Sequence, residues 1–444
     1  METGCLIILE QGHMRKFLIS TVKAIQWNIA AAFQKGLIHI FSANLLNQVL
    51  GFFSTLMVTK MLSPHEIGSL KIIQSYILIA TTFASLGFPT AIIKFCSEVK
   101  AISLREYILK YAIKNTCICA CCIYFLSILL AYLKIFSDDY IVLTWFPIYA
   151  ILILPNGIFN IIFMYLQAIK NFKKIAKLQS YMKIVSVFII IGSAYVCGIE
   201  GYVFAILITS FITIVLLLKS LKMNFLLGKR ETLPLGFIFL SRMGILTAVI
   251  GTLGKYIDIF FLDAFIQERD LIGYYAIAST FVMIGTLLVG SVQGFLTPYL
   301  AEKSRDYKTV WRDMIHYQKI LSICIMLLCP LIYIFVDVLV IFYYGLEYEC
   351  VLVYLIAMLV QLWLHSSYSI IGCTLTSLNK EHYNLTVSSI YLIIKIVLSY
   401  YFINTYGLIG FIYSQVLAEI PAIICEYIAA HMVFSRKLNI MKEG

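Results

Sequence analysis

The sequence predicts an all-α membrane protein with about twelve transmembrane helices in two six-helix lobes. Three observations predict it: bilayer-length apolar stretches fill the chain, 61% of its residues are hydrophobic and 13% charged, and its loops alternate between basic and acidic or neutral. One crossing of a hydrocarbon core about 30 Å thick takes roughly 20 helical residues. Twelve crossings therefore use most of the 444 residues and leave no room for a soluble domain.

The predicted spans follow one another with short loops between them. The fourth, eighth, tenth and twelfth spans exceed the minimum length, so they can tilt or kink. Candidate kink sites are Pro147, Pro155, Pro298 and Pro421. The twelve spans are 37–58, 72–93, 113–133, 141–166, 182–196, 201–218, 237–261, 272–300, 320–342, 350–375, 385–403 and 408–433.

The charges of the loops predict the orientation of the chain. The loops after the second, fourth and sixth spans carry +2, +4 and +3, whereas three loops on the opposite side carry −1, −1 and −3. The first group holds Lys94, Lys100, Arg105 and Lys110 with Glu98 and Glu106; Lys170, Lys173, Lys174 and Lys177; and Lys219, Lys222, Lys229 and Arg230 with Glu231. The second holds Lys134 with Asp138 and Asp139; Glu200; and Asp337, Glu347 and Glu349. Because basic loops stay in the cytoplasm, both termini are expected there, and the net charge of +11 reports orientation rather than a nucleic-acid partner.

Two terminal segments and one linker lie outside the predicted lobes. We expect a cytoplasmic or interfacial N-terminal segment, the N-terminal lobe, a cytoplasmic linker, the C-terminal lobe and a cytoplasmic tail. Their ranges are 1–36, 37–218, 219–236, 237–433 and 434–444. The first 36 residues lack a signal-peptide pattern, since the apolar run 6–9 is too short. Apolar residues at helical spacing there, from Leu18 to Phe33, fit an interfacial helix; a poorly ordered tail and a true start at Met14 stay open.

The twelve cysteines and seven histidines show no metal-binding pattern. Cys117, Cys119, Cys121 and Cys122 lie close together, but they fall inside a predicted span with no histidine nearby. That setting favours packing over metal ligation. We therefore expect no disulfide framework, no metal and no cofactor.

The chain contains a weak internal repeat. Gly68, in an Ile-Gly-Ser sequence, corresponds to Gly273, in Ile-Gly-Tyr, 205 residues later. Gly198 and Gly407, each three residues before another glycine, correspond at an offset of 209. Two halves with an even number of spans insert in the same orientation and are related by an axis along the membrane normal. This arrangement is typical of transporters whose substrate site lies between two lobes, and it favours a transporter over an enzyme.

Short motifs follow the same order through both halves. The first half contains Asn44-x-x-Asn47-Gln48, Leu62-Ser63-Pro64-x-Glu66-x-Gly68, Ser75-Tyr76 and Leu86-Gly87-Phe88. The second contains Asp258, Gly273-Tyr274-Tyr275, Pro298, Asn379-Lys380 and Tyr406-Gly407-x-x-Gly410. With these motifs, from Leu37 to Val433, the sequence resembles the bacterial polysaccharide flippases, the O-antigen unit translocases of the multidrug/oligosaccharidyl-lipid/polysaccharide exporter superfamily.

The resemblance implies two lobes that open alternately to each side of the bacterial inner membrane. The implied substrate is an undecaprenyl-diphosphate-linked oligosaccharide, carried to the periplasmic leaflet without covalent chemistry, and the implied partners are the lipid bilayer and other polysaccharide assembly proteins. A cation-coupled multidrug antiporter of the same superfamily is one alternative, but basic intramembrane residues favour an anionic substrate. A membrane polymerase or glycosyltransferase is another, although such a polymerase typically carries a long external loop.

Cations inside the spans are the first candidates for the mechanism. An unpaired cation in mid-membrane costs about 3 kcal/mol or more, so a cavity or a partner is expected beside it. Lys395, Arg242 and Lys255 are the candidates to line a cationic cavity, with snorkelling to the interface open for Arg242. Lys71 and Lys183 lie near span ends, so we expect them to snorkel.

Carboxylates and amides complete the set of candidates. Asp258 follows Lys255 by three residues, so the two can form an ion pair or a coupling site. Glu419 and Glu426 lie two helical turns apart and can be partners of Lys395 or proton carriers. The first span adds Asn44, Asn47 and Gln48, which can bind sugar hydroxyls or pair with neighbouring helices.

Overall fold

The computed structural model describes residues 37–99, 101–134, 137–221, 231–303, 306–378 and 380–443. This part of the chain contains helices and no strand, which confirms the predicted all-α fold class. The helices are α2 (Leu37–Met61), α3 (Pro64–Ala84), α4 (Phe88–Glu98), α5 (Ile102–Tyr132), α6 (Tyr140–Tyr149), η1 (Ala150–Leu152), α7 (Ile153–Ala168), α8 (Phe172–Leu221), α9 (Phe237–Phe265), α10 (Arg269–Glu302), α11 (Tyr307–Leu339), η2 (Val340–Tyr344), η3 (Leu346–Tyr348), α12 (Cys350–Ser366), α13 (Ser369–Ser377) and α14 (Glu381–Glu443). The expected N-terminal segment 1–36 and residues 222–230 of the expected linker lie outside the described residues.

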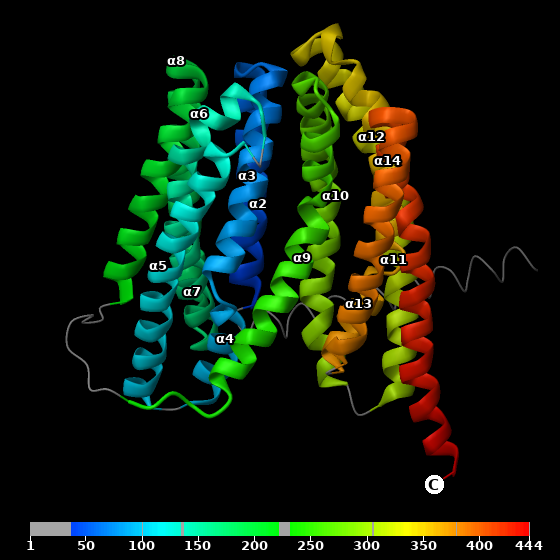
Figure 1. Cartoon of the computed structure of the whole chain (residues 1–444). Coiled ribbons are helices and arrows are strands. Elements are labelled where there is room, and N and C mark those ends of the chain that lie inside the picture. The colour runs from blue at the N-terminus through cyan, green and yellow to red at the C-terminus, as the bar shows by residue number, and fades with distance from the viewer. Residues whose placement is uncertain are drawn as a thin grey trace, which may run out of the picture.

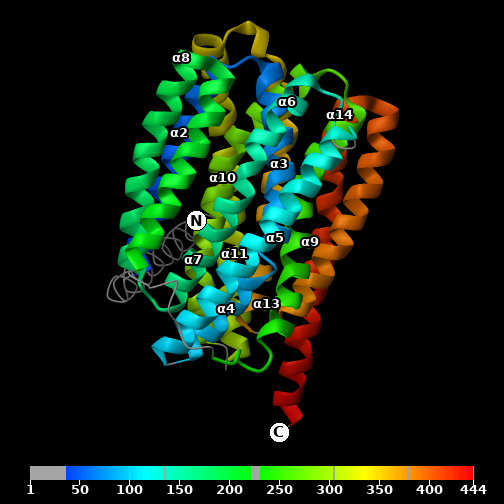
Figure 2. The same ribbon diagram turned by 60° about the vertical axis from the view of Figure 1, so that its left-hand side comes forward.

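The helices stand side by side in two lobes (Figure 1). The N-terminal lobe contains α2 to α8, and the C-terminal lobe contains α9 to α14. In the first lobe α2 packs along α8 and α5 packs on α7, while in the second α12 packs on α10, α11 and α14. At the junction α3 contacts α9 and α10, and the turned view in Figure 2 also shows these three helices together. The lobe boundaries at single residues stay predictions.

Two of the longest helices, α8 and α14, are hairpins. Each contains one glycine in the left-handed region, Gly198 with φ 57° and Gly407 with φ 62°. An ideal Cβ on Gly201 would lie 2.0 Å from the carbonyl oxygen of Ser193, whereas eight residues of straight helix span about 12 Å. An ideal Cβ on Gly410 would lie 2.5 Å from the carbonyl oxygen of Phe402, which precedes Gly407. Both turning glycines are members of the sequence repeat, so the repeat recurs in the backbone.

Nine segments of the described chain are long and apolar enough to cross a membrane. Because two of them are the hairpins α8 and α14, they contain eleven apolar helical stretches, and α2 runs beside α8. The exact number of twelve crossings stays a prediction. The first arm of α8 starts at Phe172, ten residues before the predicted fifth span, because its polar lysines resemble a loop in sequence.

Three of the membrane segments are broken within their length. The chain leaves α3 for α4 at Leu86 and Gly87, with φ of 51° and 67°, passes from α6 to α7 through the 3₁₀ turn η1, and leaves α12 for α13 near Ser367. Pro147 lies inside α6 just before the second break, while Pro421 lies inside α14. The break between α3 and α4 is followed directly by Pro89 in the first turn of α4, a proline that the sequence analysis did not select, and the break near Ser367 has no proline beside it.

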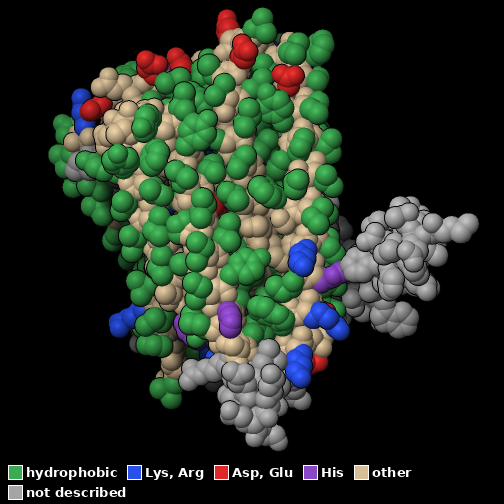
Figure 3. All heavy atoms as spheres, turned by 90° about the vertical axis from the view of Figure 1, so that its right-hand side faces the viewer, with side chains coloured by type: hydrophobic (Ala, Val, Ile, Leu, Met, Phe, Trp, Pro, Cys, Tyr) green, Lys and Arg blue, Asp and Glu red, His purple; other side chains and the backbone are tan. Residues whose placement is uncertain are grey.

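The outer surface carries an apolar belt between two charged ends. Figure 3 shows acidic side chains at the top of one face, basic side chains toward the bottom and apolar side chains between them. We call the end with Asp138, Glu200 and Glu347 the acidic end, and the end with Arg105 and Lys219 the basic end. A wide exposed apolar belt on a helical protein is the surface that hydrocarbon covers.

A capping box fixes where α3 begins. The Ser63 side chain accepts a hydrogen bond from the Glu66 backbone, and a Glu66 carboxylate oxygen accepts one from the Ser63 backbone N–H at 2.8 Å. Pro64 occupies the first turn, where a missing N–H costs nothing. The first turns of α3 are therefore set at the acidic end, and Lys71 follows two turns later.

Glycines bring the two lobes into backbone contact. Gly68 of α3 faces Gly273 of α10, where an ideal Cβ on Gly273 would lie 1.9 Å from the carbonyl oxygen of Pro64. Nearer the basic end, a Cβ on Gly87 would lie 2.0 Å from the carbonyl oxygen of Ser241 in α9. Small residues let membrane helices approach this closely. The two seams, α3 with α10 and α4 with α9, therefore hold the lobes together in this conformation.

Gly273→Ala should destabilise the molecule, because the added methyl group forces α10 away from α3. Overpacking of this kind costs about 1–3 kcal/mol. We expect a lower melting temperature of the purified protein in detergent. The matched control is Gly290→Ala in the same helix, where nothing lies within 4 Å of the added Cβ. Equal melting temperatures for the two variants would contradict the close packing at this seam.

Candidate functional site

A cavity of about 670 Å³ lies between the lobes. Helices α2, α3 and α8 form its N-terminal wall, and α10 and α12 form its C-terminal wall. The lining is rich in uncharged hydrogen-bonding groups: Ser54, Thr55, Thr59, Gln74, Ser186, Tyr202, Thr209, Ser210, Thr213, Tyr275, Ser279, Thr280, Thr286 and Gln361. Hydroxyl and amide groups both donate and accept hydrogen bonds. The cavity can therefore hold a ligand that carries many hydroxyl groups.

Two lysines give the cavity its charge, and both lie on its N-terminal wall. Lys71 comes from α3 and Lys183 from the first arm of α8. An ideal Cβ on Gly51 of α2 would lie 3.4 Å from Lys183 Nζ, so the glycine leaves room for the ammonium group. Neither lysine forms an ion pair with a described residue, and no described lining residue is acidic. In a membrane, such a pair of ammonium groups attracts an anion.

Hydrogen bonds hold the polar wall in place. The Gln74 side-chain amide donates to the hydroxyl groups of Tyr149 at 3.2 Å and Tyr202 at 3.1 Å. Gln74 and Tyr202 both line the cavity, whereas Tyr149 is buried behind it. The wall near Lys71 is therefore a connected polar surface rather than a set of independent side chains.

At the acidic end, side chains of the two lobes bond to each other. The hydroxyl groups of Thr59 and Tyr344 lie 2.7 Å apart. Asp263 of the C-terminal lobe accepts a hydrogen bond from Ser137 of the N-terminal lobe at 2.9 Å and pairs with Arg269 at 2.7 Å. These contacts link α2 and the α5–α6 connection to the opposite lobe, so the lobes are fastened together beyond the cavity.

Lys395 lies inside the C-terminal lobe and not in the cavity lining. Its ammonium group pairs with Asp258 at 2.7 Å, donates to the Gly254 carbonyl oxygen at 3.2 Å, and has a 4% exposed side chain. The Tyr391 ring lies 5.7 Å from the ammonium group. The expected partners differ from the observed one: Asp258 pairs with Lys395 rather than with Lys255, because the α14 helix presents Lys395 directly to α9.

Glu419 is buried in a cluster of hydrogen-bond donors. Its carboxylate accepts bonds from Tyr368 at 2.7 Å, Tyr391 at 3.1 Å and Gln361 at 3.3 Å, and His365 Nδ1 lies 3.6 Å away. Since Gln361 also lines the cavity, the cluster reaches the cavity wall. Glu419 is therefore satisfied without Lys395, the partner that the sequence suggested.

The remaining candidates from the sequence lie outside the described lining of the cavity. Arg242 and Lys255 are exposed on α9. Asn47 and Gln48 are half-buried on α2, where the Asn47 side-chain oxygen has no hydrogen-bond partner in the described part of the chain. The side chain of Asn44 lies outside the described residues. None of the described candidate cations joins Lys71 and Lys183 in the cavity.

Sequence reasoning missed the two lysines that line the cavity. The sequence predicts that Lys71 and Lys183 snorkel to the interface, whereas both line the cavity. One signal was available: Lys71 follows the capping box by two turns on a helix rich in buried residues, so it lies deeper than its distance from the predicted span end suggests. The Ser and Thr lining has no such signal, because these residues are common in membrane helices.

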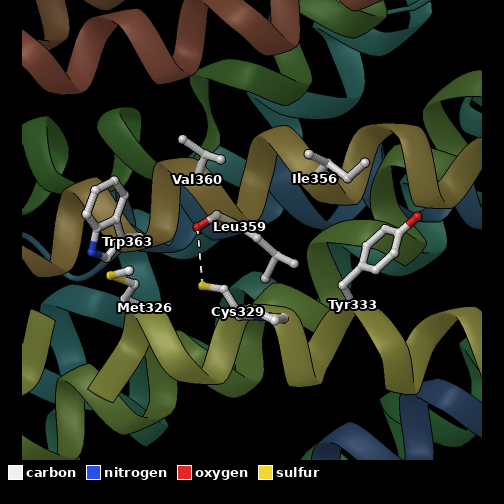
Figure 4. A pocket seen from close by; sticks show the side chains of 8 residues that line it. Met326, Cys329, Tyr333, Ile356, Leu359, Val360 and Trp363 are labelled. Atoms are coloured by element: carbon white, nitrogen blue, oxygen red, sulfur yellow. Dashed lines mark hydrogen bonds between the residues drawn. The ribbon is translucent and has the colours of Figure 1, made fainter. Parts of the chain in front are cut away.

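A second, smaller hollow of about 230 Å³ lies between α11 and α12 (Figure 4). Its lining is apolar, and the one hydrogen bond drawn there runs from Cys329 Sγ to the Leu359 carbonyl oxygen at 3.5 Å. Met326 and Ile356 are exposed on the outer surface beside it. This hollow belongs to the lipid-facing belt and offers no charge to a ligand. Among the described residues, no group of three His, Cys, Asp or Glu side chains converges as a metal site.

Solved structures share this fold at low sequence identity. The lipid II flippase MurJ in an inward closed conformation has 17% identity and a TM-score of 0.73, covering 90% of this chain and 91% of its own. An inward-facing multidrug resistance MATE family transporter of the MOP superfamily has 13% identity and a TM-score of 0.71, covering 88% and 95%. A MOP superfamily transporter from Pyrococcus furiosus, described as having a binding pocket of reverse polarity, has 14% identity and a TM-score of 0.68, covering 90% and 95%. The curated proteins searched contain no match.

The expected transporter fold is therefore confirmed, with two lobes and a cavity between them as the setting of the site. A family model described as polysaccharide biosynthesis protein matches residues 33–304, which is more than half of the chain. The chain belongs to this polysaccharide biosynthesis protein family, and it has the transporter fold shared by MurJ and the MATE proteins.

Proposed function

We propose that this protein is a flippase that moves an undecaprenyl-diphosphate-linked oligosaccharide, such as an O-antigen repeat unit, from the cytoplasmic to the periplasmic leaflet. The observation that carries the proposal is the cavity with Lys71, Lys183 and a hydroxyl-rich lining without acidic residues. A diphosphate needs cationic contacts, a glycan needs hydrogen bonds, and the prenyl chain can stay in the bilayer. The family match and the fold shared with a lipid II flippase support the same class of substrate.

The two kinds of polar contact are arranged asymmetrically. Both lysines belong to the N-terminal lobe, whereas the C-terminal wall offers Ser279, Thr280 and Gln361. The diphosphate therefore binds along α3 and α8, and the sugar hydroxyls bind across the cavity on α10 and α12. Closing the lobes around the headgroup brings both sets of contacts together, which is what alternating access requires of a substrate.

A cation-coupled multidrug antiporter is the second candidate, because MATE transporters share the fold. A cationic drug needs a carboxylate or an aromatic face in its cavity. The described lining includes the rings of Tyr202 and Tyr275, but it has two ammonium groups and no carboxylate, so its net charge repels a cation. Measuring the efflux of a cationic dye from cells that carry the protein tests this: efflux that depends on the protein would favour the antiporter over the flippase.

We propose that the protein lies in the bacterial inner membrane with its basic end in the cytoplasm. Its proposed partners are other polysaccharide assembly proteins. Reporter fusions after Lys174, Lys229 and Met441 should read cytoplasmic, and fusions after Asp139 and Glu347 periplasmic. The reason is that short loops rich in Lys and Arg stay on the cytoplasmic side. A reversed reading at any one of these sites contradicts the proposed topology.

Removing both cavity lysines should stop the flipping of a diphosphate-linked lipid. We expect Lys71→Ala with Lys183→Ala to lose two charge-assisted contacts, each worth about 1.5–3 kcal/mol. The transport rate in proteoliposomes, measured with a fluorescent lipid-linked oligosaccharide, should then fall by roughly 100-fold or more. The matched control is Lys255→Ala, an exposed lysine outside the cavity. A rate equal to that of the unmodified protein would overturn the assignment.

Lys395→Ala should lower the amount of protein in the membrane, because it strands the buried Asp258 carboxylate. Breaking a buried ion pair by removing one partner costs about 3–5 kcal/mol. The double change Lys395→Ala with Asp258→Ala should restore much of the abundance, which immunoblots of purified membranes measure. Normal abundance of Lys395→Ala together with lost glycan export would instead indicate direct contact between Lys395 and the substrate.

A further inference from the structure

A buried carboxyl group, Glu426, lies in the second arm of α14. It is 6% exposed, and its Oε2 atom has no hydrogen-bond partner in the described part of the chain. The ion pairs found among the described residues do not include it. Glu419, two turns earlier on the same helix, accepts three hydrogen bonds. Two glutamates on one face of one helix therefore have opposite surroundings.

A second oxygen without a described donor, Asn384 Oδ1, lies beside Gly372 of α13, as Glu426 does. An ideal Cβ on Gly372 of α13 would lie 3.5 Å from Glu426 Oε1 and 3.9 Å from Asn384 Oδ1. The Asn384 amide nitrogen donates to the Gly372 carbonyl oxygen at 2.7 Å and to Thr376 Oγ1 at 3.0 Å. Because a carbonyl oxygen only accepts, the amide orientation is fixed, and Asn384 Oδ1 is left without a described donor.

Glu426 Oε2 and Asn384 Oδ1 both lack a hydrogen-bond donor among the described residues. A proton bound to Glu426 is the smallest group that provides one. A bound metal cation is a poor alternative, since hard cations such as Mg²⁺ and Ca²⁺ take about six or more oxygen ligands. Here the Gly372 carbonyl and the Thr376 hydroxyl oxygens already accept bonds from Asn384. A neutral carboxylic acid, in contrast, removes the charge and provides an O–H donor for a neighbouring acceptor.

Other ionisable groups connect this site with the cavity. His365 of α12 lies close enough to interact electrostatically with Glu426, and its Nδ1 lies 2.9 Å from the Tyr368 hydroxyl. Tyr368 donates to Glu419, which also accepts a bond from Gln361 in the cavity wall. Among the described residues, the ionisable groups that interact with Glu426 are His365 from α12 and Tyr368 at the start of α13. A change in the charge of Glu426 therefore alters the electrostatic environment of His365, which these hydrogen bonds connect with Gln361 in the cavity wall.

We infer that Glu426 binds a proton in this conformation and releases it as the lobes exchange access, so that a proton is the coupling ion of the transport cycle. The coupling role rests on the proposed flippase function, whereas the protonated carboxyl group itself does not. In the cycle Glu426 takes the proton from water on one side of the membrane and releases it to water on the other side, and no other atom is transferred.

Infrared spectroscopy of the full-length protein in lipid tests the site. The carbonyl band of a buried carboxylic acid should be present in the unmodified protein at neutral pH and lost in Glu426→Gln, which is isosteric with the protonated acid. The matched control Glu419→Gln, two turns away on the same helix, should keep the band because Glu419 is a hydrogen-bonded carboxylate. A band that persists in Glu426→Gln overturns the inference.

A measurement on the unmodified protein does not depend on the folding of any variant. A hydrophobic carbodiimide modifies protonated carboxyl groups within membranes, and peptide mass spectrometry locates the modified residue. We expect modification at Glu426 and not at Glu419. Modification at Glu419 alone, or at neither residue, overturns the inference even where Glu426→Gln fails to fold.

Transport in proteoliposomes then tests the coupling. A pH gradient should stimulate flipping of the lipid-linked diphosphate by the unmodified protein, and Glu426→Gln should lose that stimulation, about 5-fold or more for a typical coupling between sites. The control Glu200→Gln, an exposed residue at the acidic end, should keep it. Retained stimulation in Glu426→Gln overturns the coupling role. Absent flipping at every pH by the unmodified protein contradicts the flippase proposal instead and leaves the infrared result standing.

Discussion

The absence of water in the hydrocarbon core is the constraint on which the rest of this structure depends. Every polar group placed there needs a partner within the protein. The hairpins α8 and α14 keep the backbone bonded through two crossings each, and the Lys395 pair with Asp258 neutralises two charges inside the C-terminal lobe. Among the described residues, the Lys71 and Lys183 ammonium groups form no ion pair and Glu426 Oε2 has no hydrogen-bond partner, so these groups are the ones available for function.

The two lobes contribute different charged groups. The ammonium groups of Lys71 and Lys183, which form no ion pair with a described residue, lie on the N-terminal wall of the cavity, where a diphosphate can neutralise them. The C-terminal lobe keeps its own charges paired or satisfied behind the wall, in the Lys395 and Glu419 clusters, and reaches the cavity through Gln361. Substrate contact and the proposed proton site are thus separate in space. Hydrogen bonds connect Gln361 with His365, and His365 interacts electrostatically with Glu426.

Glycine sets the geometry between these parts. Gly198 and Gly407 turn the chain back at the acidic end, and Gly68 and Gly273 allow backbone contact between the lobes. Each of these positions belongs to the internal repeat seen in the sequence. The repeated positions therefore include both the turning points within the lobes and glycines of the contact between them.

The sequence by itself determined the all-α membrane fold, most of the membrane spans and the two repeated halves, because these follow from bilayer thickness, hydropathy and turn-forming glycines, which act locally. It also identified Lys395, Asp258, Glu419 and Glu426 as intramembrane charges. Only the tertiary structure decided their partners and placed Lys71 and Lys183 in the cavity instead of Arg242 and Lys255. The physical reason is that a side chain's partner depends on which face of its helix meets another helix, and contacts between residues more than a hundred positions apart, such as Lys395 and Asp258, leave no trace in local spacing.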